Sequence, residues 1–303
     1  MIEEQERSLW RKLVVRLPYA WLIAFFLVPF LIVLKISLSQ TAIAQPPYVP
    51  VLNFAGGWQG LIASFGSFSF DNYLLLGSDE QYALSYAKSL EIAAVATLIL
   101  LVIGYPIAYA IARVPRRWQG VFVMLTILPF WTSLLIRIYA WMNILQHDGP
   151  LNELLLAFSI VKEPPVWLAT NTAIYIGIVY SYLPFIVLPL YATLEKLDES
   201  LLEAAADLGC PRWKTFWLVT WPLSRSGVLA GVLLCFIPIV GEFVIPDLLG
   251  ASKSPMIGQT IWIEFFGNKD WPAASAVAVV LLCLLVTPIV IYQNRSMPAL
   301  ERR

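Results

Sequence analysis

Residues 195–222 read EKLDESLLEAAADLGCPRWKTFWLVTWP and separate two long apolar stretches with a run of charged and polar side chains. Asp198 can cap a helix that begins near Glu199, because short acidic side chains accept hydrogen bonds from the free N–H groups of a first turn. The alanines that follow favour that helix. Gly209 suits a helix stop, and Pro211 prevents its continuation. This pattern predicts a short helix, a Gly-Pro turn and a second helix that runs toward the next apolar stretch.

The composition of the chain indicates that its solvent is lipid. The 303 residues are 59% hydrophobic and 13% charged, whereas soluble domains carry about 25% charged residues. A formal net charge of zero argues against nucleic acid as a partner. The chain has a single histidine, His147, which argues against a histidine-based metal site and against a Ser-His-Asp catalytic triad. No phosphate-binding loop of the form G-x-x-x-x-G-K-S/T occurs, so we expect an integral membrane protein that is not an enzyme.

Six apolar stretches are long enough to cross a bilayer, for which a helix needs about 20 mainly apolar residues. They lie near residues 17–38, 90–112, 121–145, 171–194, 227–249 and 273–292. The chain is therefore predicted to be all-α, with six transmembrane helices. We expect it to divide into a cytoplasmic N-terminal segment at 1–16, a transmembrane domain at 17–293 and a cytoplasmic tail at 294–303.

Lysine and arginine are distributed unevenly between the two sets of loops. The basic set comprises the segments before the first span, between spans two and three, between spans four and five, and after the last span. It holds Arg7, Arg11, Lys12, Arg16, Arg113, Arg116, Arg117, Lys196, Arg212, Lys214, Arg225, Arg295, Arg302 and Arg303. The opposite loops hold mainly Lys88, Lys162, Lys253 and Lys269. Because cytoplasmic loops are enriched in these residues, both termini are predicted to be cytoplasmic.

The segments on either side of the first span carry two further interpretations. A basic leader and the sequence Ala42-Ile43-Ala44 resemble the ends of a cleaved signal peptide. The apolar run is longer than a signal core, so we expect an uncleaved anchor and keep cleavage as the alternative. Segment 40–88 combines prolines with aromatic residues such as Trp58 and Phe65. It is predicted to be an ordered external loop rather than a floppy linker.

The segment at 195–222 is similar to the EAA loop of permease subunits of binding-protein-dependent ABC importers. That pattern consists of Glu-Ala-Ala, three residues, Gly, nine residues and Ile-x-Leu-Pro. The chain matches it at Glu203, Ala204, Ala205, Gly209 and Pro222. It differs at Val219, where Ile is usual, and at Trp221, where Leu is usual. The resemblance implies a type I ABC importer permease fold with a cytoplasmic coupling loop, and the alternative is an ordinary solvated helical hairpin.

The same resemblance implies how the loop would work. It would dock into a cleft of a separate ATPase subunit, so that closure of the ATPases moves the spans between inward-facing and outward-facing states. The coupling residues would be Glu203, Ala204, Ala205, Asp207 and Gly209. Glu203 would form a charged hydrogen bond with the ATPase, and Gly209 would let the chain turn. No cofactor is expected on this chain, because ATP and Mg²⁺ would be bound by the partner ATPase.

Acidic residues near the fifth span are candidates for a cation pathway, because ionisable groups in a span are costly and mostly functional. Glu242 lies in PIVGEFVIP at 238–246, where two prolines and Gly241 predict a kinked or interrupted helix. Its carboxylate, with Asp247 nearer the external mouth, would attract a cation. Two interpretations stay open for Glu242: a place on the substrate pathway, or a structural ion pair with Arg137 or with a base of a partner subunit.

Aromatic residues of the third span are further candidates, because ring faces attract ammonium groups. They are Trp131, Tyr139 and Trp141. Tryptophan and tyrosine also anchor helices at membrane interfaces, and for any single ring the anchoring or packing interpretation is favoured.

Longer stretches extend the resemblance over nearly the whole chain, toward permeases of putrescine and spermidine importers. They are LPFWTSLLIRIYAWMNIL from Leu128, YIGIVYSYLPFIVLPLYATL from Tyr175, GEFVIPDLLG from Gly241 and MIGQTIWIEFFGNKDWPAASAVA from Met256. The resemblance implies a multi-pass protein of a bacterial inner membrane. It also implies three kinds of partner: a second, different permease subunit, two ATPase subunits and a periplasmic polyamine-binding protein.

Other classes of membrane protein make different predictions. A secondary transporter of a small organic cation, driven by an ion gradient, would need no ATPase and favours inverted repeats, of which none is convincing here. An intramembrane enzyme would need a catalytic dyad or metal motif within the spans, and a channel would need repeated filter residues. Copurification with an ATPase would separate an importer from all three.

Overall fold

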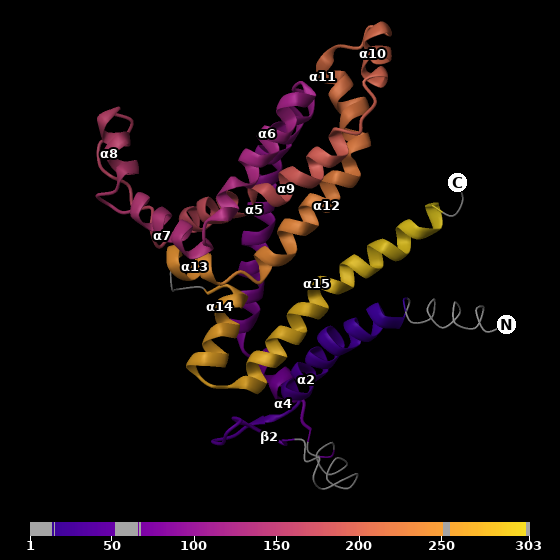
Figure 1. Ribbon diagram of the computed structural model, residues 1–303. Coiled ribbons are helices and arrows are strands. Elements are labelled where there is room, and N and C mark those ends of the chain that lie inside the picture. Colours follow the sequence, from indigo (N-terminus) through magenta and orange to yellow (C-terminus); the bar gives the residue numbers. More distant parts are fainter. Residues whose placement is uncertain (1–13, 15, 52–65, 67, 251–254, 301–303) are drawn as a thin grey trace, which may run out of the picture. The chain divides into compact units, whose positions relative to one another are not determined.

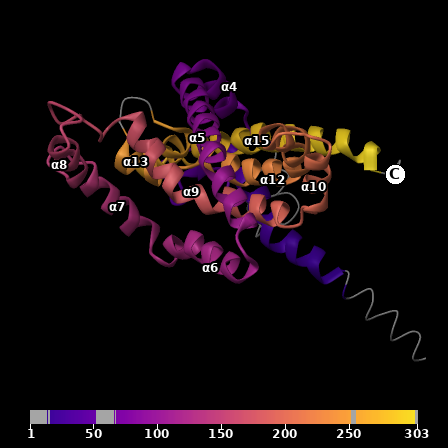
Figure 2. The ribbon, with the colours of Figure 1, turned by 90° about the horizontal axis from the view of Figure 1, so that it is seen from above.

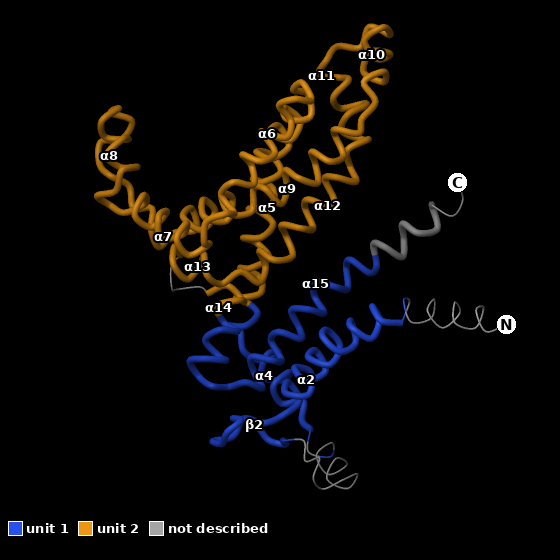
Figure 3. The backbone as a smooth tube through the Cα atoms, viewed as in Figure 1, with its two compact units in different colours: residues 1–83, 260–303 blue, residues 84–259 orange. Residues whose placement is uncertain are grey.

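The computed structural model describes residues 14, 16–51, 66, 68–250 and 255–300, with side chains described as far as residue 291. These residues are mostly helical (Figure 1). They form two compact units (Figure 3). Unit 1, residues 1–83 with 260–303, joins the two ends of the chain, and unit 2, residues 84–259, holds the middle.

Unit 1 is built around the first and last helices of the chain. An apolar helix spans Arg16–Ser37 and contains a π-helical turn, η1 (Ile23–Leu27), followed by α2 (Val28–Ser37). α2 packs along α15 (Trp271–Leu300) (Figure 1). A short helix, α4 (Asp71–Ser78), also contacts α15, which is preceded by a second π-helical turn, η5 (Ile263–Gly267).

A small hairpin follows α2 and is fixed to the start of α15. Strands β1 (Gln40–Thr41) and β2 (Tyr48–Val49) pair antiparallel, with Thr41 opposite Tyr48. The Thr41 hydroxyl donates to Asp270 Oδ1 at 2.7 Å, and the Tyr48 ring lies 6.2 Å from that of Trp271. The described part of the 40–88 segment is therefore ordered. Trp58 and Phe65 lie outside the described residues, and the second helix begins at Glu80, ahead of the span expected from 90.

Unit 2 centres on three long helices: α5 (Glu80–Arg113), which begins in unit 1, α9 (Asn171–Leu194) and α12 (Trp221–Val240). α9 and α12 form the most extensive helix pair. Their close approach depends on glycine, as in many membrane helix pairs. A Cβ at Gly231 would lie 3.1 Å from the Ile186 side chain, and one at Gly227 would lie 2.5 Å from Thr193 Oγ1.

The third span is bent where the sequence predicted a continuous helix over 121–145. Helix α6 (Arg116–Ile127) continues into a 3₁₀ turn, η3 (Leu128–Trp131), and α7 (Leu134–Ile144) leaves at 88°. Thr132 at the break is extended, and its backbone N–H and hydroxyl both donate to the carbonyl of Pro129. That carbonyl is thereby satisfied without continuing the helix.

The fifth span is interrupted, as the two prolines and Gly241 predicted. The helical segment begins earlier than residue 227, at α11 (Arg212–Thr215), and runs through a π-helical turn, η4 (Phe216–Thr220), into α12. α12 ends at Val240, and a separate short helix, α13 (Val244–Leu249), follows the break. Glu242 lies in the break itself rather than within a helix.

The number of spans agrees with the prediction. Among the described residues, five helices are long and apolar enough to cross a membrane, and the bent α6–α7 pair makes a sixth.

Within unit 2, α8 (Pro150–Ala157) and α10 (Ser200–Asp207) lie at opposite ends in both views (Figures 1 and 2). This placement agrees with loops that were predicted to lie on opposite sides of the membrane.

Candidate functional site

The predicted coupling loop is a helical projection at one end of unit 2 (Figure 1). Glu203, Ala204 and Asp207 are exposed on α10, and Ala205 is half-buried. Leu208 at the end of α10 is 87% exposed, and Trp213 on α11 is also exposed. Apolar side chains that are exposed beside an exposed carboxylate form a surface suited to a protein partner.

The turn in this projection has the predicted local structure. Gly209 has a φ of +74°, the left-handed conformation that only glycine adopts at little cost. Asp198 Oδ1 accepts a hydrogen bond from the Ser200 backbone N–H at 3.0 Å, at the start of α10. This hydrogen bond stabilises the charged carboxylate and so lowers the pKa of Asp198, and the negative charge in turn stabilises the first turn of the helix.

Aromatic side chains join the base of the projection to α5. Phe216, in the π-helical turn, packs edge-on against Tyr105 with ring centroids 5.5 Å apart. Trp221 also contacts Tyr105 at 5.5 Å and Trp217 at 5.8 Å. The Tyr105 hydroxyl shares a buried 2.8 Å hydrogen bond with Ser224. The tryptophan that departs from the EAA pattern therefore has an aromatic partner on α5.

A second connection lies at the C-terminal end of α5. Arg113 Nη1 lies 3.3 Å from Glu199 Oε1, just before α10. The guanidinium also stacks over the Tyr109 ring at 5.3 Å. Arg113 and Glu199 line a polar cavity of about 930 Å³ between the α5–α6 junction and the segment that leads into α10.

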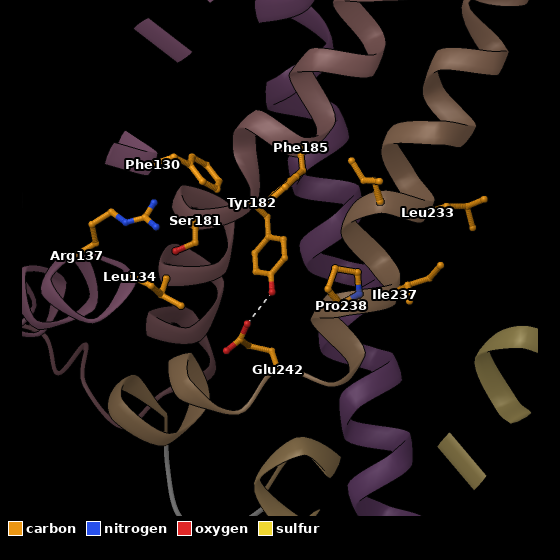
Figure 4. Close-up of a pocket in the computed structure, with 11 residues that line it drawn as sticks. Phe130, Leu134, Arg137, Ser181, Tyr182, Phe185, Leu233, Ile237, Pro238 and Glu242 are labelled. Carbon is orange, nitrogen blue, oxygen red and sulfur yellow. Dashed lines mark hydrogen bonds between the residues drawn. The ribbon is translucent and has the colours of Figure 1, made fainter. Parts of the chain in front are cut away.

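The break at the far end of α12 lines a different cavity, of about 560 Å³ (Figure 4). Its wall is mostly apolar, with polar groups from α7, α9 and the break that follows α12. The lining residues are Phe130, Leu134, Arg137, Ser181, Tyr182, Phe185, Leu233, Leu234, Ile237, Pro238 and Glu242. Such a concave, largely apolar site with a few polar groups is the usual form of a small-molecule site.

Glu242 is held at the edge of this cavity by hydrogen bonds. The Tyr182 hydroxyl donates to its Oε2 at 2.6 Å (Figure 4). The backbone N–H groups of Val244 and Ile245 donate to Oε1 at 3.1 and 3.4 Å. These two amides belong to the first turn of α13, so the carboxylate caps that helix.

Arg137 lines the same cavity from α7 without forming an ion pair with Glu242. Its guanidinium lies over the Phe130 ring, 5.0 Å from the centroid. Among the described residues, the ion pairs are Lys88–Glu91 and Arg113–Glu199. The internal pairing considered for Glu242 is therefore not formed in this structure.

One sequence family matches the region that holds the projection and the cavity. Its description is "Binding-protein-dependent transport system inner membrane component", and it matches residues 101–296. The chain belongs to this family. The chain is thus a multi-pass inner-membrane component, a permease rather than an enzyme, of a transport system that uses a binding protein.

Curated relatives of this inner-membrane component include permeases of spermidine/putrescine transport systems. The spermidine/putrescine transport system permease protein PotB of Haemophilus influenzae is 36% identical over 286 residues, which cover 94% of both chains. PotB of Escherichia coli K12 is 40% identical over 229 residues, covering 76% of this chain and 83% of the relative. Family membership favours an importer subunit over the ion-gradient-driven alternative.

Solved structures confirm the predicted ABC importer permease fold. A chain of a bacterial ABC transporter involved in the import of the acidic polysaccharide alginate matches with a TM-score of 0.71. The two chains are 14% identical, and the match covers 98% of each. A chain of an alginate ABC transporter in complex with an alginate pentasaccharide-bound periplasmic protein matches with a TM-score of 0.74, also at 14% identity, covering 97% of this chain and 96% of that one.

The other predicted pathway residues of the inner-membrane component do not line the cavity. Asp247 is exposed in the first turn of α13 and accepts a 3.5 Å hydrogen bond from Gln259. Trp131 and Tyr139 are exposed, Trp131 by 71%. Trp141 packs edge-on against Tyr180 of α9 at 5.5 Å. The cavity that Glu242 lines is thus formed by residues other than the pathway residues predicted from the sequence.

Sequence reasoning missed the residues that surround Glu242. Tyr182 and Ser181 lie on α9, and Phe130 and Phe185 pack edge-on at 5.1 Å across the cavity wall. A signal was present, because Ser181 is a small polar residue in the middle of a mostly apolar span, and polar residues within spans are often functional. Their meeting with Glu242 depends on the α9–α12 packing, which no local pattern displays.

Proposed function

We propose that this permease is a subunit of an ATP-driven importer of polyamines, putrescine or spermidine or both. The observation that carries the proposal is the similarity to PotB of H. influenzae, a spermidine/putrescine transport system permease, over 94% of each chain. The similarity includes the cavity and the coupling loop, so it concerns the parts that would move the substrate as well as the scaffold.

The proposed importer has several subunits. A second, different permease completes the pathway, two ATPase subunits bind ATP and Mg²⁺, and a periplasmic protein delivers the polyamine. The family description supports the binding protein. Both termini and α10 lie on the cytoplasmic side in this proposal, in keeping with the lysine and arginine bias of those segments.

Glu203, Ala204, Ala205, Asp207 and Gly209 are proposed to form the surface that docks into the ATPase. The exposure of this surface supports the role, because a coupling helix must be free to insert into a cleft. Movement of α10 would reach the spans through two routes. One is the ion pair of Arg113 with Glu199, and the other is the packing of Phe216 and Trp221 on Tyr105. The π-helical turn at 216–220 lies at this junction, and π turns are frequent at functional sites.

Glu242 is proposed to contact the polyamine during passage. Three features support this: a carboxylate at the edge of a cavity, three aromatic rings in its wall, and a mostly apolar lining that would face methylene groups. The rings of Phe130, Tyr182 and Phe185 can stabilise an ammonium group. Phe130 already has a cation over its face, the Arg137 guanidinium. Asp247, exposed on α13 beyond the break, would attract the cation before it reaches Glu242.

The periplasmic protein is proposed to dock on the hairpin of unit 1. The hairpin and the turn before α15 line a cavity of about 820 Å³. Ile43 at the tip of the hairpin is fully exposed. The hydrogen bond from Thr41 to Asp270 holds the hairpin in a fixed position, which suits a surface that binds a rigid partner.

The experiment that tests the proposal is uptake of radiolabelled putrescine and spermidine by cells that express or lack this chain. Cellular ATP is held normal or depleted while the proton gradient is maintained. We expect loss of ATP-dependent uptake of at least one polyamine on deletion, and recovery on complementation. Unchanged uptake in a strain without other polyamine systems would contradict the substrate assignment. Uptake that follows the proton gradient instead of ATP would contradict the coupling mechanism.

A further inference from the structure

A buried arginine in the cavity lacks an acceptor in this chain. Arg137 is 9% exposed, and its Nε and Nη1 atoms are buried with no hydrogen-bond partner among the described residues. Ser181, which lines the same cavity and is 4% exposed, also has a buried hydroxyl without a partner in the described part of the chain. The Phe130 ring stabilises the charge but accepts no N–H hydrogen bond of ordinary strength. Buried polar groups are nearly always paired, so these two residues indicate a missing acceptor.

The acceptor does not come from the carboxylate that shares the cavity. Among the described residues Arg137 forms no ion pair with Glu242, whose oxygens accept from Tyr182 and from the amides of α13. Figure 4 shows Arg137 and Ser181 on the α7 side of the cavity and Glu242 at the break of α12. A polyamine cannot serve either, because its ammonium groups repel a guanidinium and offer no acceptor. An acceptor on another chain that reaches the cavity would pair with both groups.

We propose that a carboxylate of the second permease subunit enters the cavity and pairs with Arg137 and Ser181. The planar guanidinium matches a carboxylate with two parallel hydrogen bonds. The buried positive charge of Arg137 favours an acidic protein side chain as the occupant, and Leu234, which lines the same cavity and is 50% exposed, offers apolar surface to the same partner. Apolar side chains around a central charged pair exclude water, as in the energetically important centres of interfaces. This inference rests on the proposed function only in requiring a second permease.

The test begins with the assembled importer, expressed with an affinity tag on this chain. We expect Arg137→Glu to weaken recovery of the second permease about a hundredfold, since loss of one partner of a buried pair leaves an unpaired charge. Uptake should fall with it. Lys162→Glu, which reverses an exposed charge outside the cavity, is the matched control. Selection for restored uptake in Arg137→Glu should yield acidic-to-basic changes in a span of the second permease. Normal assembly of Arg137→Glu, or restoring changes at Glu242 of this chain, would overturn the proposal.

A second measurement does not depend on a charge reversal that could unfold the chain. A photoreactive p-benzoylphenylalanine at Leu234 is irradiated in the otherwise unchanged complex, and the products are identified by mass spectrometry. We expect a cross-link to a spanning segment of the second permease that contains aspartate or glutamate. Adducts with lipid alone would show that lipid covers this side of the cavity and would refute the interface. The cross-link is read without substrate, so it can succeed even if the polyamine assignment fails.

Discussion

Replacement of Gly227 by alanine should force α9 and α12 apart. The added Cβ would lie 2.5 Å from Thr193 Oγ1, 2.8 Å from Thr193 Cβ and 3.0 Å from the Pro189 carbonyl oxygen. The threonine cannot rotate away without cost, because its hydroxyl donates to that same carbonyl at 2.9 Å. Overpacking of this kind costs about 1–3 kcal/mol, and the lost hydrogen bond adds roughly 0.5–1.5 kcal/mol. The higher helix propensity of alanine offsets about 1 kcal/mol of this loss, so we expect a net loss of about 0.5–3.5 kcal/mol in the free energy of unfolding.

The assay is reversible unfolding of the purified chain in mixed detergent and dodecyl sulfate micelles, followed by circular dichroism. Gly120→Ala is the matched control, because a Cβ there meets no atom within 4 Å. It should leave the free energy of unfolding unchanged or raise it by up to ~1 kcal/mol. Adding Thr193→Ala to Gly227→Ala should recover stability, with a coupling energy of about 0.5–3 kcal/mol. Additive effects, or a Gly227→Ala variant as stable as Gly120→Ala, would refute the packing argument.

Three further predictions concern the proposed functional residues. Glu203→Lys should reduce ATP-dependent uptake about tenfold or more at a normal level in the membrane, measured beside Glu163→Lys, an exposed charge reversal outside the loop; equal uptake by the two variants would exclude the docking role. Gly209→Ala should lower the free energy of unfolding by about 1–2 kcal/mol, because the position has a positive φ, and it should lower uptake per ATP hydrolysed. Gly209→Asn should lower both quantities less. Uptake by both variants equal to that of the unchanged chain would show that the turn is not needed. Glu242→Gln should reduce uptake with the complex still recovered intact, and by more than Tyr182→Phe, which removes one hydrogen bond; loss of assembly would indicate a structural role for Glu242.

The elements controlled by local chemistry could be predicted from the sequence. Gly209 and Pro211 ended the coupling helix where expected, because positive φ and a missing N–H act within a few residues. The six apolar stretches were found for the same reason, since spanning depends on local length and composition. The interruption near Glu242 followed from Gly241 and two prolines.

Features that depend on packing between distant segments could not be predicted. The bend at Thr132 lies within an apolar run, and hydropathy does not distinguish a straight helix from two helices at 88°. The partner of Glu242 is Tyr182, some sixty residues away, and their contact exists only because α9 and α12 pack closely through glycines. The aromatic residues of the third span were predicted by type alone, and Trp131 and Tyr139 are exposed outside the cavity that Glu242 lines.

Because α2 pairs with α15, the two helices of this pair are synthesised far apart in time. The first helix is complete roughly 230 residues before the start of the helix it packs against, which is roughly 10–50 s of translation at ~5–20 residues per second. During that interval it must persist in the bilayer without the long helix that it packs against. Its apolar window has a mean hydropathy of 2.4, which favours a helix that stays in lipid before its partner is made. The order of synthesis thus limits how many polar residues the first span can contain, even where α15 could later bury them.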